Sequence, residues 1–481
     1  MGSARETAVL TLAACERQGA WSDGYLKRAV RENGLDRRDA ALAARLCYGV
    51  LQNKLLLDWR LVRVCSMKLD KLDVRVLCGL RVGAYQLLFL DKIPPSAAVN
   101  EAVELAKRHS RNPRAAGLVN GVLRALLREE EPEIKGRDPL DTLSIRYSHP
   151  RWLVEEFTGL LGMEGAEALL EADNGQPPTT AQVNPLKTTR PRLEEDLRAA
   201  GVEVEPHPWL EDCLLLRGTG DLERLDSFRR GEFYVQDAAS RLAVLAAGPR
   251  PGQRVLDCCA APGGKSFAAA ILMENRGELI SCDIHPHKIK LLEAGRDRLG
   301  LSAMAPTLQN GARFREDWAE RFDVVLTDVP CSGLGIIRKK PDIRYKDPGP
   351  LEGLPRVQRG ILDNCARYVR PGGTLLYSTC TLLPRENDGV VDGFLNEHPE
   401  FAPEPFVLPR LGEQPGRITF WPHIHGTDGF FAAKLRRRGD SHDRPEIHDA
   451  GRAGGVFQGA GPARVPGHAG VSVAPPGGGV L

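Results

Sequence analysis

Two cysteines, each placed just after an apolar run, are the residues best suited to chemistry in this sequence. Cys331 follows Asp328-Val-Pro, and Cys380 follows Ser378-Thr. A thiolate that adds to carbon 6 of a cytosine makes carbon 5 able to take a methyl group from a sulfonium donor. An acid touching the ring nitrogen would stabilise that adduct, and a second thiol would remove the carbon 5 proton. A lone cysteine is more often a small buried apolar residue, so it is the pair that favours this chemistry.

A glycine-containing stretch, Val255 to Ser266, precedes both cysteines. It reads Val-Leu-Asp-Cys-Cys-Ala-Ala-Pro-Gly-Gly-Lys-Ser, which predicts a strand, a tight turn and a helix. Open α/β sheets bind ligands at such strand ends, beside a helix N-terminus. Cys259 stands where a P-loop has glycine, so a phosphate cradle is not indicated. Asp283, which closes the next apolar run, is placed to bind ribose hydroxyls; a solvated strand-end carboxylate is the other interpretation.

The segment from 233 to 438 supplies the elements that would position these residues. Apolar runs alternate there with helical patterns, which predicts a mostly parallel, doubly wound sheet. We expect strands at 254–256, 278–282, near Thr307, at 322–326 and at 374–377, with helices from 265, at 288–299, 354–369 and 386–395. The last strand, 429–435, has no following helix and suits an antiparallel edge. Both cysteine loops would then open onto the same face as Gly263 and Asp283.

Residues 1–128 have a different pattern. Apolar residues recur at helical spacing, which predicts an all-α bundle of about seven helices, including 5–17, 40–51, 56–64, 72–88, 97–107 and 115–127. Basic residues outnumber acidic ones in this part, although the whole chain has a net charge of only +2. A polyanionic partner and a solvated helical surface are both compatible with that excess.

Three further segments complete the chain. Residues 129–142 are acidic and contain Pro and Gly, which marks a linker. Residues 143–232 predict a small α+β module, with helices at 149–161, 164–171 and 192–200 and strands at 179–183, 202–204 and 213–217. Residues 439–481 are rich in Gly and Pro and poor in aromatic residues, so we expect this tail to be disordered.

Composition restricts the class of protein. With 42% hydrophobic and 27% charged residues, the chain resembles a soluble globular protein. No apolar run is long enough for a membrane span and no signal-peptide layout is present, so we expect a cytoplasmic protein. The eleven cysteines form no CxxC pair or His/Cys cluster, so we expect neither a disulfide framework nor a metal site.

The helical segment resembles the RNA-binding antitermination factor NusB. The matching motifs, in the same order, begin at Leu80, Ile93 and Gly117 and cover most of the segment. The resemblance implies an RNA-binding bundle. For Asn100 and Asn120, which lie in these motifs, helix packing and capping are an alternative to RNA contact.

The rest of the chain resembles the RNA cytosine-5 methyltransferases. Five ordered motifs carry the resemblance; they begin at Tyr234, Asp257, Asp328, Ser378 and Gly426. Together with the NusB-like segment they are similar to the bacterial Sun/Fmu type, which modifies 16S ribosomal RNA. The resemblance implies a multidomain protein: an all-α NusB-like bundle, a small α+β module and an α/β Rossmann-like (class I) S-adenosylmethionine-dependent methyltransferase domain.

The resemblance also implies roles for individual residues. Cys380 would be the attacking nucleophile and Cys331 the thiol needed for release. Asp328 would lie between cofactor and base, and Lys265 would help to position the reacting groups. S-adenosylmethionine would be held by Asp328 and Asp283 together with the turn residues Cys259, Ala260, Ala261, Pro262, Gly263, Gly264 and Lys265.

Two positions depart from the family pattern. The acid that usually meets the adenine amino group is missing from Gln309-Asn-Gly-Ala-Arg, so Asn310 or nothing takes that role. An amide still accepts a hydrogen bond, and we expect weaker cofactor binding. Gln182 stands where an arginine is common, which removes one expected RNA contact.

The expected partner is 16S rRNA, naked or in an early assembly intermediate, and we expect a monomer with no metal and no membrane partner. Two alternatives stay open at this point. One is a tRNA cytosine-5 methyltransferase, and the other is a non-catalytic NusB-like RNA-binding or antitermination factor. The second needs neither Cys331 nor Cys380.

Overall fold

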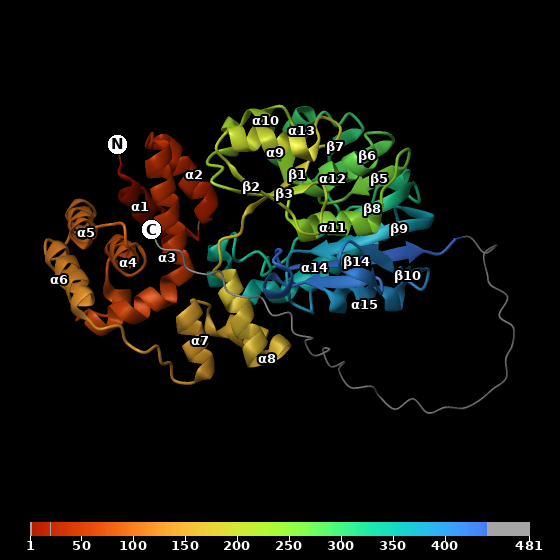
Figure 1. The fold of residues 1–481 in the computed structure, drawn as a ribbon. Coiled ribbons are helices and arrows are strands. Elements are labelled where there is room, and N and C mark those ends of the chain that lie inside the picture. The colour runs from red at the N-terminus through yellow and green to blue at the C-terminus, as the bar shows by residue number, and fades with distance from the viewer. Residues whose placement is uncertain (1, 20, 440–481) are drawn as a thin grey trace, which may run out of the picture. The chain divides into compact units, whose positions relative to one another are not determined.

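The computed structural model describes residues 2–19 and 21–439. These residues belong to one compact unit that ends at Gly439 (Figure 1). The tail, for which the sequence predicts disorder, lies outside the described residues from residue 440 onward. No described helix is long and apolar enough to cross a membrane.

The N-terminal part is a helical bundle, as the sequence predicts. Its helices are α1 (Ala4–Gln18), α2 (Ser22–Glu32), α3 (Arg37–Val64), α4 (Val74–Phe89), α5 (Pro95–His109) and α6 (Ala115–Arg128), with a 3₁₀ turn at Leu69–Lys71. Ser3 and Asp36 cap α1 and α3 by accepting hydrogen bonds from backbone N–H groups of the first turn. Apolar faces of all six helices share one core that includes Leu12, Leu26, Leu46, Val82, Val99 and Leu123.

Two details of this bundle differ from the sequence prediction. The segments expected as separate helices at 40–51 and 56–64 form the single helix α3, which is kinked at Asn53 (φ −121°). The side-chain amide of Asn53 donates a hydrogen bond to the carbonyl of Gly49, one turn earlier in α3. The helix is therefore kinked at this position but continues beyond it. Helix α2 was not predicted, because its sequence is mostly polar and only its Leu26 and Ala29 side chains are buried among the apolar residues.

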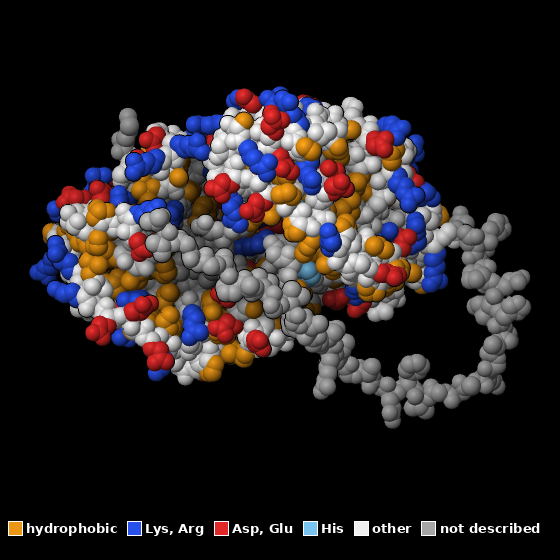
Figure 2. All heavy atoms as spheres, viewed as in Figure 1, with side chains coloured by type: hydrophobic (Ala, Val, Ile, Leu, Met, Phe, Trp, Pro, Cys, Tyr) orange, Lys and Arg blue, Asp and Glu red, His pale blue; other side chains and the backbone are white. Residues whose placement is uncertain are grey.

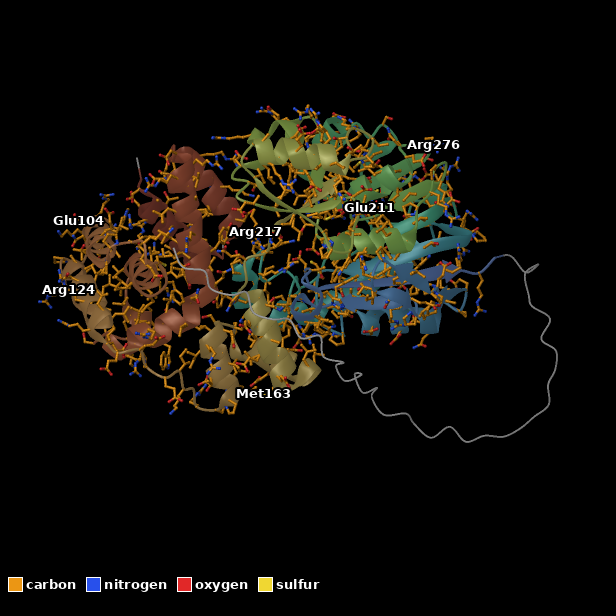
Figure 3. All side chains as sticks on the ribbon, in the orientation of Figure 1. Glu104, Arg124, Met163, Glu211, Arg217 and Arg276 are labelled. Carbon is orange, nitrogen blue, oxygen red and sulfur yellow. The ribbon has the colours of Figure 1, made fainter. Side chains whose placement is uncertain are left out.

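Charged side chains of both signs cover the bundle. Figure 2 shows Lys and Arg interspersed with acidic and apolar side chains on the visible face. Glu104 on α5 and Arg124 on α6 project outward (Figure 3), and Arg124 Nε donates to Asn120 Oδ1 at 2.9 Å. The Asn120 side chain is thus engaged within its own helix.

Helices α7 (Pro139–Tyr147) and α8 (Arg151–Asp173) follow, so the linker is shorter than the predicted 129–142. Gly162, with φ +72°, breaks α8 where the sequence predicts the division between two helices. The apolar face of α8 shares a core with residues of the loops that carry the two cysteines. That core includes Leu153, Phe157, Leu334, Ile337, Leu382 and Leu383.

A small antiparallel sheet forms the next part, in the strand order β2-β3-β1-β4. Its strands are β1 (Thr179–Val183), β2 (Glu203–Pro206), β3 (Cys213–Arg217) and β4 (Phe233–Val235), and its helices are α9 (Arg190–Ala199) and α10 (Asp226–Arg229), with a 3₁₀ turn at Leu222–Arg224. Its core contains Ala181, Leu193, Leu197, Leu214 and Phe233. The predicted module 143–232 is therefore divided between two cores, one that contains α7 and α8 and one that contains the small sheet. The sheet also includes β4, which lies beyond residue 232.

The large sheet has the order β10-β14-β9-β8-β5-β6-β7, and β13 also pairs with β14. Pairs among β5, β6, β7, β8 and β9 are parallel, and those of β14 are antiparallel. The strands are β5 (Arg254–Asp257), β6 (Glu278–Asp283), β7 (Met304–Leu308), β8 (Phe322–Asp328), β9 (Val369–Thr379), β10 (Phe401–Pro403), β13 (Arg417–Phe420) and β14 (Phe430–Arg437). The predicted α/β architecture is confirmed.

The expectation that the last strand forms an edge is wrong. Strand β14 pairs with β9 on one side and with β10 and β13 on the other. The sequence did not predict β10, β13 or the separate hairpin of β11 (Phe406–Leu408) and β12 (Gly412–Gln414), since these strands have only three or four residues each. Both faces of β14 are also covered, since Phe430 and Ala432 share a core with α11 and Phe431 and Ala433 share a core with α15, which explains its apolar Phe-Phe-Ala-Ala run.

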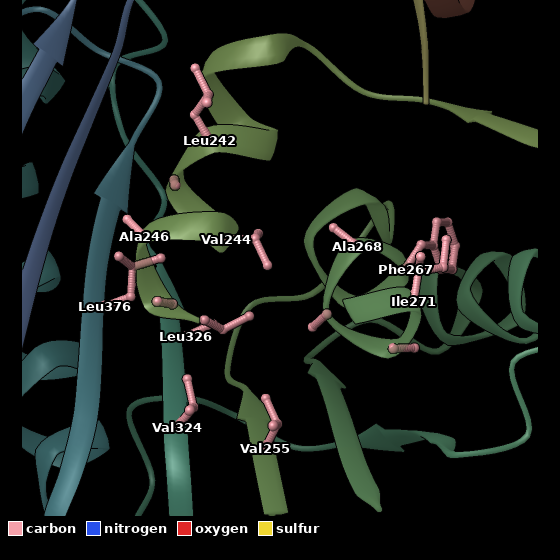
Figure 4. Close-up of a cluster of buried hydrophobic side chains, with 14 of the residues drawn as sticks. Leu242, Val244, Ala246, Val255, Phe267, Ala268, Ile271, Val324, Leu326 and Leu376 are labelled. Carbon is pink, nitrogen blue, oxygen red and sulfur yellow. The ribbon is translucent and has the colours of Figure 1, made fainter. Parts of the chain in front are cut away.

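Helices cover both faces of this sheet. Figure 4 shows residues of α11 and α12, among them Leu242, Phe267 and Ile271, packed near Val255, Val324 and Leu326 of the central strands. The opposite face is covered by α14 and α15 (Figure 1). The helices are α11 (Ala238–Ala247), α12 (Gly264–Leu272), α13 (Pro286–Leu299), α14 (Leu354–Ala366), α15 (Asp388–Glu397) and α16 (Pro422–His425), with 3₁₀ turns at Glu316–Trp318, Pro341–Tyr345 and Gly349–Gly353.

Candidate active site

The two cysteines lie side by side at the carboxyl ends of β8 and β9. These strands are parallel neighbours in which Asp328 is paired with Ser378, so the residues that follow each strand emerge together. The Sγ atoms of Cys331 and Cys380 are 3.3 Å apart, and both side chains are partly exposed. Ser332 Oγ and Thr381 Oγ1, 2.7 Å apart, join the same two loops. Both thiols can therefore reach one bound molecule.

Asp328 and Lys265 form an ion pair beside the thiols. Asp328 Oδ2 is 2.7 Å from Lys265 Nζ, and its Oδ1 accepts from Ser378 Oγ at 2.8 Å. Only 12% of the Lys265 side chain is exposed. Burial opposes the charge on this lysine, but the Asp328 carboxylate and other acidic groups nearby together outweigh burial and raise the pKa of Lys265. The ion pair thus holds the Asp328 side chain at the end of β8.

The pKa of the Cys331 thiol lies well above its ordinary value. The main cause is the contact with Cys380; burial and the negative charges of Cys380 and Glu386 add to it. Cys331 therefore keeps its proton at neutral pH.

The glycine-containing turn lies between β5 and α12. Asp257, at the end of β5, is fully buried, and its Oδ2 accepts from Ser266 Oγ at 2.7 Å. Burial raises the pKa of Asp257 to about 6, against the opposing Ser266 hydrogen bond. Its Oδ1 has no hydrogen-bond partner within the described part of the chain. A buried acceptor of this kind suits a donor group on a bound molecule.

The backbone of this turn is shaped by a cis peptide bond and by two glycines. Cys259 and Ala260 leave β5, with Ala260 N–H donating to the carbonyl of Cys282, and a cis peptide bond joins Ala261 to Pro262. Gly263 has φ +120°, and a Cβ there would lie 2.3 Å from the ring of Phe267. Gly264 then opens α12, whose first turn has no side-chain cap. Its N–H groups are available to an anionic group such as a carboxylate.

Asp283 ends β6, beside β5. Its Oδ1 accepts from His285 N–H at 2.9 Å, its Oδ2 lies 3.6 Å from Lys288 Nζ, and its side chain is 9% exposed. The loop after β7 lies next to Asp283, because the Gln309 N–H donates a hydrogen bond to the Asp283 carbonyl. The carboxylate is thus fixed at the same end of the sheet as the glycine turn.

The two positions that depart from the family pattern occupy different surroundings. Asn310 is exposed, and its Oδ1 accepts from Ala312 N–H at 2.9 Å, so the amide oxygen is used within its own loop. Gly311 lies against the glycine turn, since a Cβ there would be 3.3 Å from the Cys258 carbonyl. Gln182 is buried, and its Nε2 donates to the Gln236 carbonyl at 3.0 Å.

Sequence reasoning missed several buried polar residues around the thiols. Glu386, Asn387 and Gln358 form hydrogen bonds to both cysteine loops. Arg338 and Lys339, in the loop after Cys331, contact the carboxylates of Asp237 and Asp428. Asp237 and Asp428 lie in two of the motifs that carry the family resemblance, and this contact explains why both motifs accompany the site. A signal was present in Leu383-Pro-Arg-Glu-Asn, where polar residues directly follow the strand end of Cys380.

These residues fit S-adenosylmethionine. The uncapped start of α12 suits its carboxylate, the free Asp257 oxygen suits an ammonium donor, and Asp283 suits ribose hydroxyls. The Asp328–Lys265 pair and the two thiols lie beyond the glycine turn, where the methyl acceptor would enter. In the described ranges, no three His, Cys, Asp or Glu side chains are arranged to hold a metal ion.

Comparisons with known proteins agree with this geometry. Residues 244–436 match the family model of the 16S rRNA methyltransferase RsmB/F, residues 2–128 match the NusB family, and residues 149–223 match the ferredoxin-like domain of RsmF/B-like methyltransferases. The predicted family resemblance and the predicted fold class are confirmed.

Individual relatives cover nearly the whole chain. The probable ribosomal RNA small subunit methyltransferase B of Bacillus subtilis is 40% identical over 91% of this chain and 99% of its own length. The corresponding probable enzyme of Synechocystis is 34% identical over 91% of this chain and 100% of its own. A solved structure described as PH0851 matches with a TM-score of 0.77 and 27% identity, over 91% of this chain and 99% of that one. The chain belongs to the ribosomal RNA small subunit methyltransferase B family.

Proposed function

We propose that this methyltransferase transfers the methyl group of S-adenosylmethionine to carbon 5 of a cytosine in 16S rRNA, through a covalent bond between Cys380 and carbon 6. The observation that carries the proposal is the 3.3 Å contact of Cys331 and Cys380 beside the Asp328–Lys265 pair. The relatives in Bacillus subtilis and Synechocystis are probable ribosomal RNA methyltransferases, which supports a ribosomal RNA substrate.

The glycine turn would hold the cofactor. Bound S-adenosylmethionine supplies an electrophilic methyl group. The first turn of α12 after Gly263 would bind its carboxylate, Asp257 would accept a hydrogen bond from its amino group and Asp283 would accept hydrogen bonds from its ribose. Asn310 would be the side chain nearest the adenine amino group, although its Oδ1 already accepts a hydrogen bond from Ala312 N–H.

The Cys380 thiolate begins the reaction by forming a bond to carbon 6 of the cytosine. Ring nitrogen 3 takes up a proton from solvent as negative charge develops there, and the Asp328 carboxylate accepts a hydrogen bond from the resulting N–H while Lys265 holds the carboxylate in place. Carbon 5 then has enamine character and would form a bond to the methyl group as the bond from that methyl group to the sulfonium sulfur breaks, which leaves a neutral thioether. Each step requires the base and Cys380 to meet at the carboxyl end of β9.

Cys331 completes the reaction. Once Cys380 is bonded to carbon, it no longer carries the charge or accepts the contact that raises the pKa of Cys331. The pKa of Cys331 falls, its proton leaves to solvent through its exposed side, and the thiolate removes the carbon 5 proton. The electrons of that C–H bond reform the double bond as the bond from carbon 6 to Sγ breaks, which frees Cys380.

Bisulfite sequencing of ribosomal and transfer RNA from a strain lacking this gene tests the substrate. We expect one cytosine of 16S rRNA to lose its methyl group and to regain it with the wild-type gene but not with a Cys380→Ala gene. Loss of methylation in tRNA alone would support the tRNA alternative. Unchanged methylation in both RNA pools would contradict the proposal.

A further inference from the structure

Glu386 lies directly under the loop of Cys331. It is fully buried, and its Oε2 accepts from Ser332 N–H at 2.9 Å and from Gln358 Nε2 at 2.8 Å. Gln358 Nε2 also donates to the Pro330 carbonyl at 3.0 Å. The residues on both sides of Cys331 are thus held by one carboxylate and its amide partner.

Asn387, the next residue, holds the loop of Cys380 in the same way. Its Oδ1 accepts from Thr379 Oγ1 at 2.6 Å, and its Nδ2 donates to the Thr381 carbonyl at 3.0 Å. Its side chain is buried. The residues on both sides of Cys380 are therefore held by one amide.

Glu386 and Asn387 are both attached to the large sheet through one hydrogen bond. Tyr377, in β9, donates its hydroxyl hydrogen to the Glu386 carbonyl at 2.6 Å, which fixes the dipeptide to the sheet. Burying a carboxylate without a cationic partner costs free energy, and here Glu386 Oε1 has no hydrogen-bond partner in the part of the chain that the structure describes. An apolar residue would fill this buried position at a lower cost in free energy, so the presence of a carboxylate here indicates a role in the site.

We propose that Glu386 and Asn387 are positioning residues that set the spacing of the two thiols, with Glu386 placing Cys331 for release and Asn387 placing Cys380 for attack. This inference rests on the proposed two-thiol reaction. It divides that reaction between two adjacent side chains, because the Glu386 carboxylate hydrogen-bonds to Ser332, beside Cys331, whereas the Asn387 amide hydrogen-bonds to Thr379 and Thr381, beside Cys380.

The test uses the full chain with a 16S rRNA transcript and S-adenosylmethionine, in single-turnover reactions. Methyl transfer and the SDS-resistant protein–RNA adduct are measured separately for Glu386→Ala and Asn387→Ala. Glu386→Ala should transfer the methyl group but release the RNA about tenfold more slowly, so the adduct accumulates. Asn387→Ala should slow methyl transfer about tenfold and accumulate no adduct. Glu397→Gln, on the exposed end of α15, is the matched control and should behave as wild type.

A second readout does not depend on the RNA reaction. The negative charge of Glu386 contributes to the raised pKa of Cys331, after the contact with Cys380 and burial. Glu386→Gln keeps an acceptor for Ser332 N–H but removes the charge. Alkylation of the Cys331 peptide by iodoacetamide, followed by mass spectrometry across pH, should therefore shift to lower pH in Glu386→Gln and not in Glu397→Gln.

The outcomes separate the inference from the proposed function. If Cys331→Ala accumulates adduct but Glu386→Ala releases RNA at the wild-type rate, the positioning role is wrong and the two-thiol reaction stands. Equal losses of both steps in Glu386→Ala and Asn387→Ala would also overturn the division of roles. If Cys331→Ala itself accumulates no adduct, the proposed reaction is wrong, and the inference falls with it.

Discussion

The backbone N–H of Asp428 donates to the carboxylate of Asp237 at 3.1 Å, and the two carboxylates share the cations of Arg338 and Lys339. Asp237 begins α11, Asp428 precedes β14, and the two cations belong to the loop after Cys331. Gly429 N–H also donates to the Gly335 carbonyl at 2.7 Å. Three distant segments thus meet in one buried cluster that holds the Cys331 loop.

Removing Arg338 should destabilise the protein. Arg338 is only 10% exposed, and Arg338→Met would leave the buried Asp237 and Asp428 carboxylates with Lys339 alone. We expect a loss of about 3 kcal/mol in the free energy of unfolding, measured by urea denaturation. Arg276→Met is the control: Arg276 lies on the surface (Figure 3), is 66% exposed, and should change stability by less than about 0.5 kcal/mol. Equal stability of the two variants would contradict a structural role for the cluster.

Gly263 should be intolerant of any side chain. Its φ of +120° disfavours other residues, and a Cβ would approach the Phe267 ring to 2.3 Å. Gly263→Ala should therefore weaken S-adenosylmethionine binding about tenfold or more, as measured by calorimetry. Gly360→Ala in α14, where a Cβ meets no atom within 4 Å, should leave binding unchanged. Wild-type affinity in Gly263→Ala would show that the turn does not form the cofactor cradle.

Asp173 should make stability depend on pH. It is fully buried, and burial raises its pKa to about 7, although the Arg344 charge opposes the shift. Because the folded protein holds this proton more tightly than the unfolded chain, the stabilising contribution is complete below about pH 4 and is lost as pH rises to about 7. Asp173→Asn should therefore remove part of the fall in stability between pH 5 and pH 8, in urea denaturation at both pH values. An identical fall in wild type and variant would contradict the raised pKa.

The sequence predicted the two thiols as a site because the carboxyl ends of neighbouring parallel strands must meet. Cys331 and Cys380 each follow a recognisable buried strand, so strand order alone brings them together. The residues that hold them were not predictable in the same way. Glu386 follows the strand end of Cys380 but acts on the loop of Cys331, and Arg338 pairs with carboxylates from two other motifs. Such contacts depend on the course of the loops, and loops lack the periodic pattern of apolar residues from which helices and strands are predicted.

Local features of the sequence explain where the observed fold differs from the predicted one. Asn53 kinks α3 instead of ending it, and the three- and four-residue strands around β14 are too short to show an alternation. The position of β14 inside the sheet follows from those short strands. Its own sequence is compatible with an edge or an interior strand.

The central claim is that Cys380 attacks the base and Cys331 releases it. The most direct measurement is the SDS-resistant protein–RNA adduct formed on a 16S rRNA transcript with S-adenosylmethionine, compared among wild type, Cys331→Ala and Cys380→Ala. The account predicts that Cys331→Ala accumulates the adduct, whereas Cys380→Ala forms none and transfers no methyl group. Normal turnover by Cys331→Ala, or an adduct formed by Cys380→Ala, would contradict it.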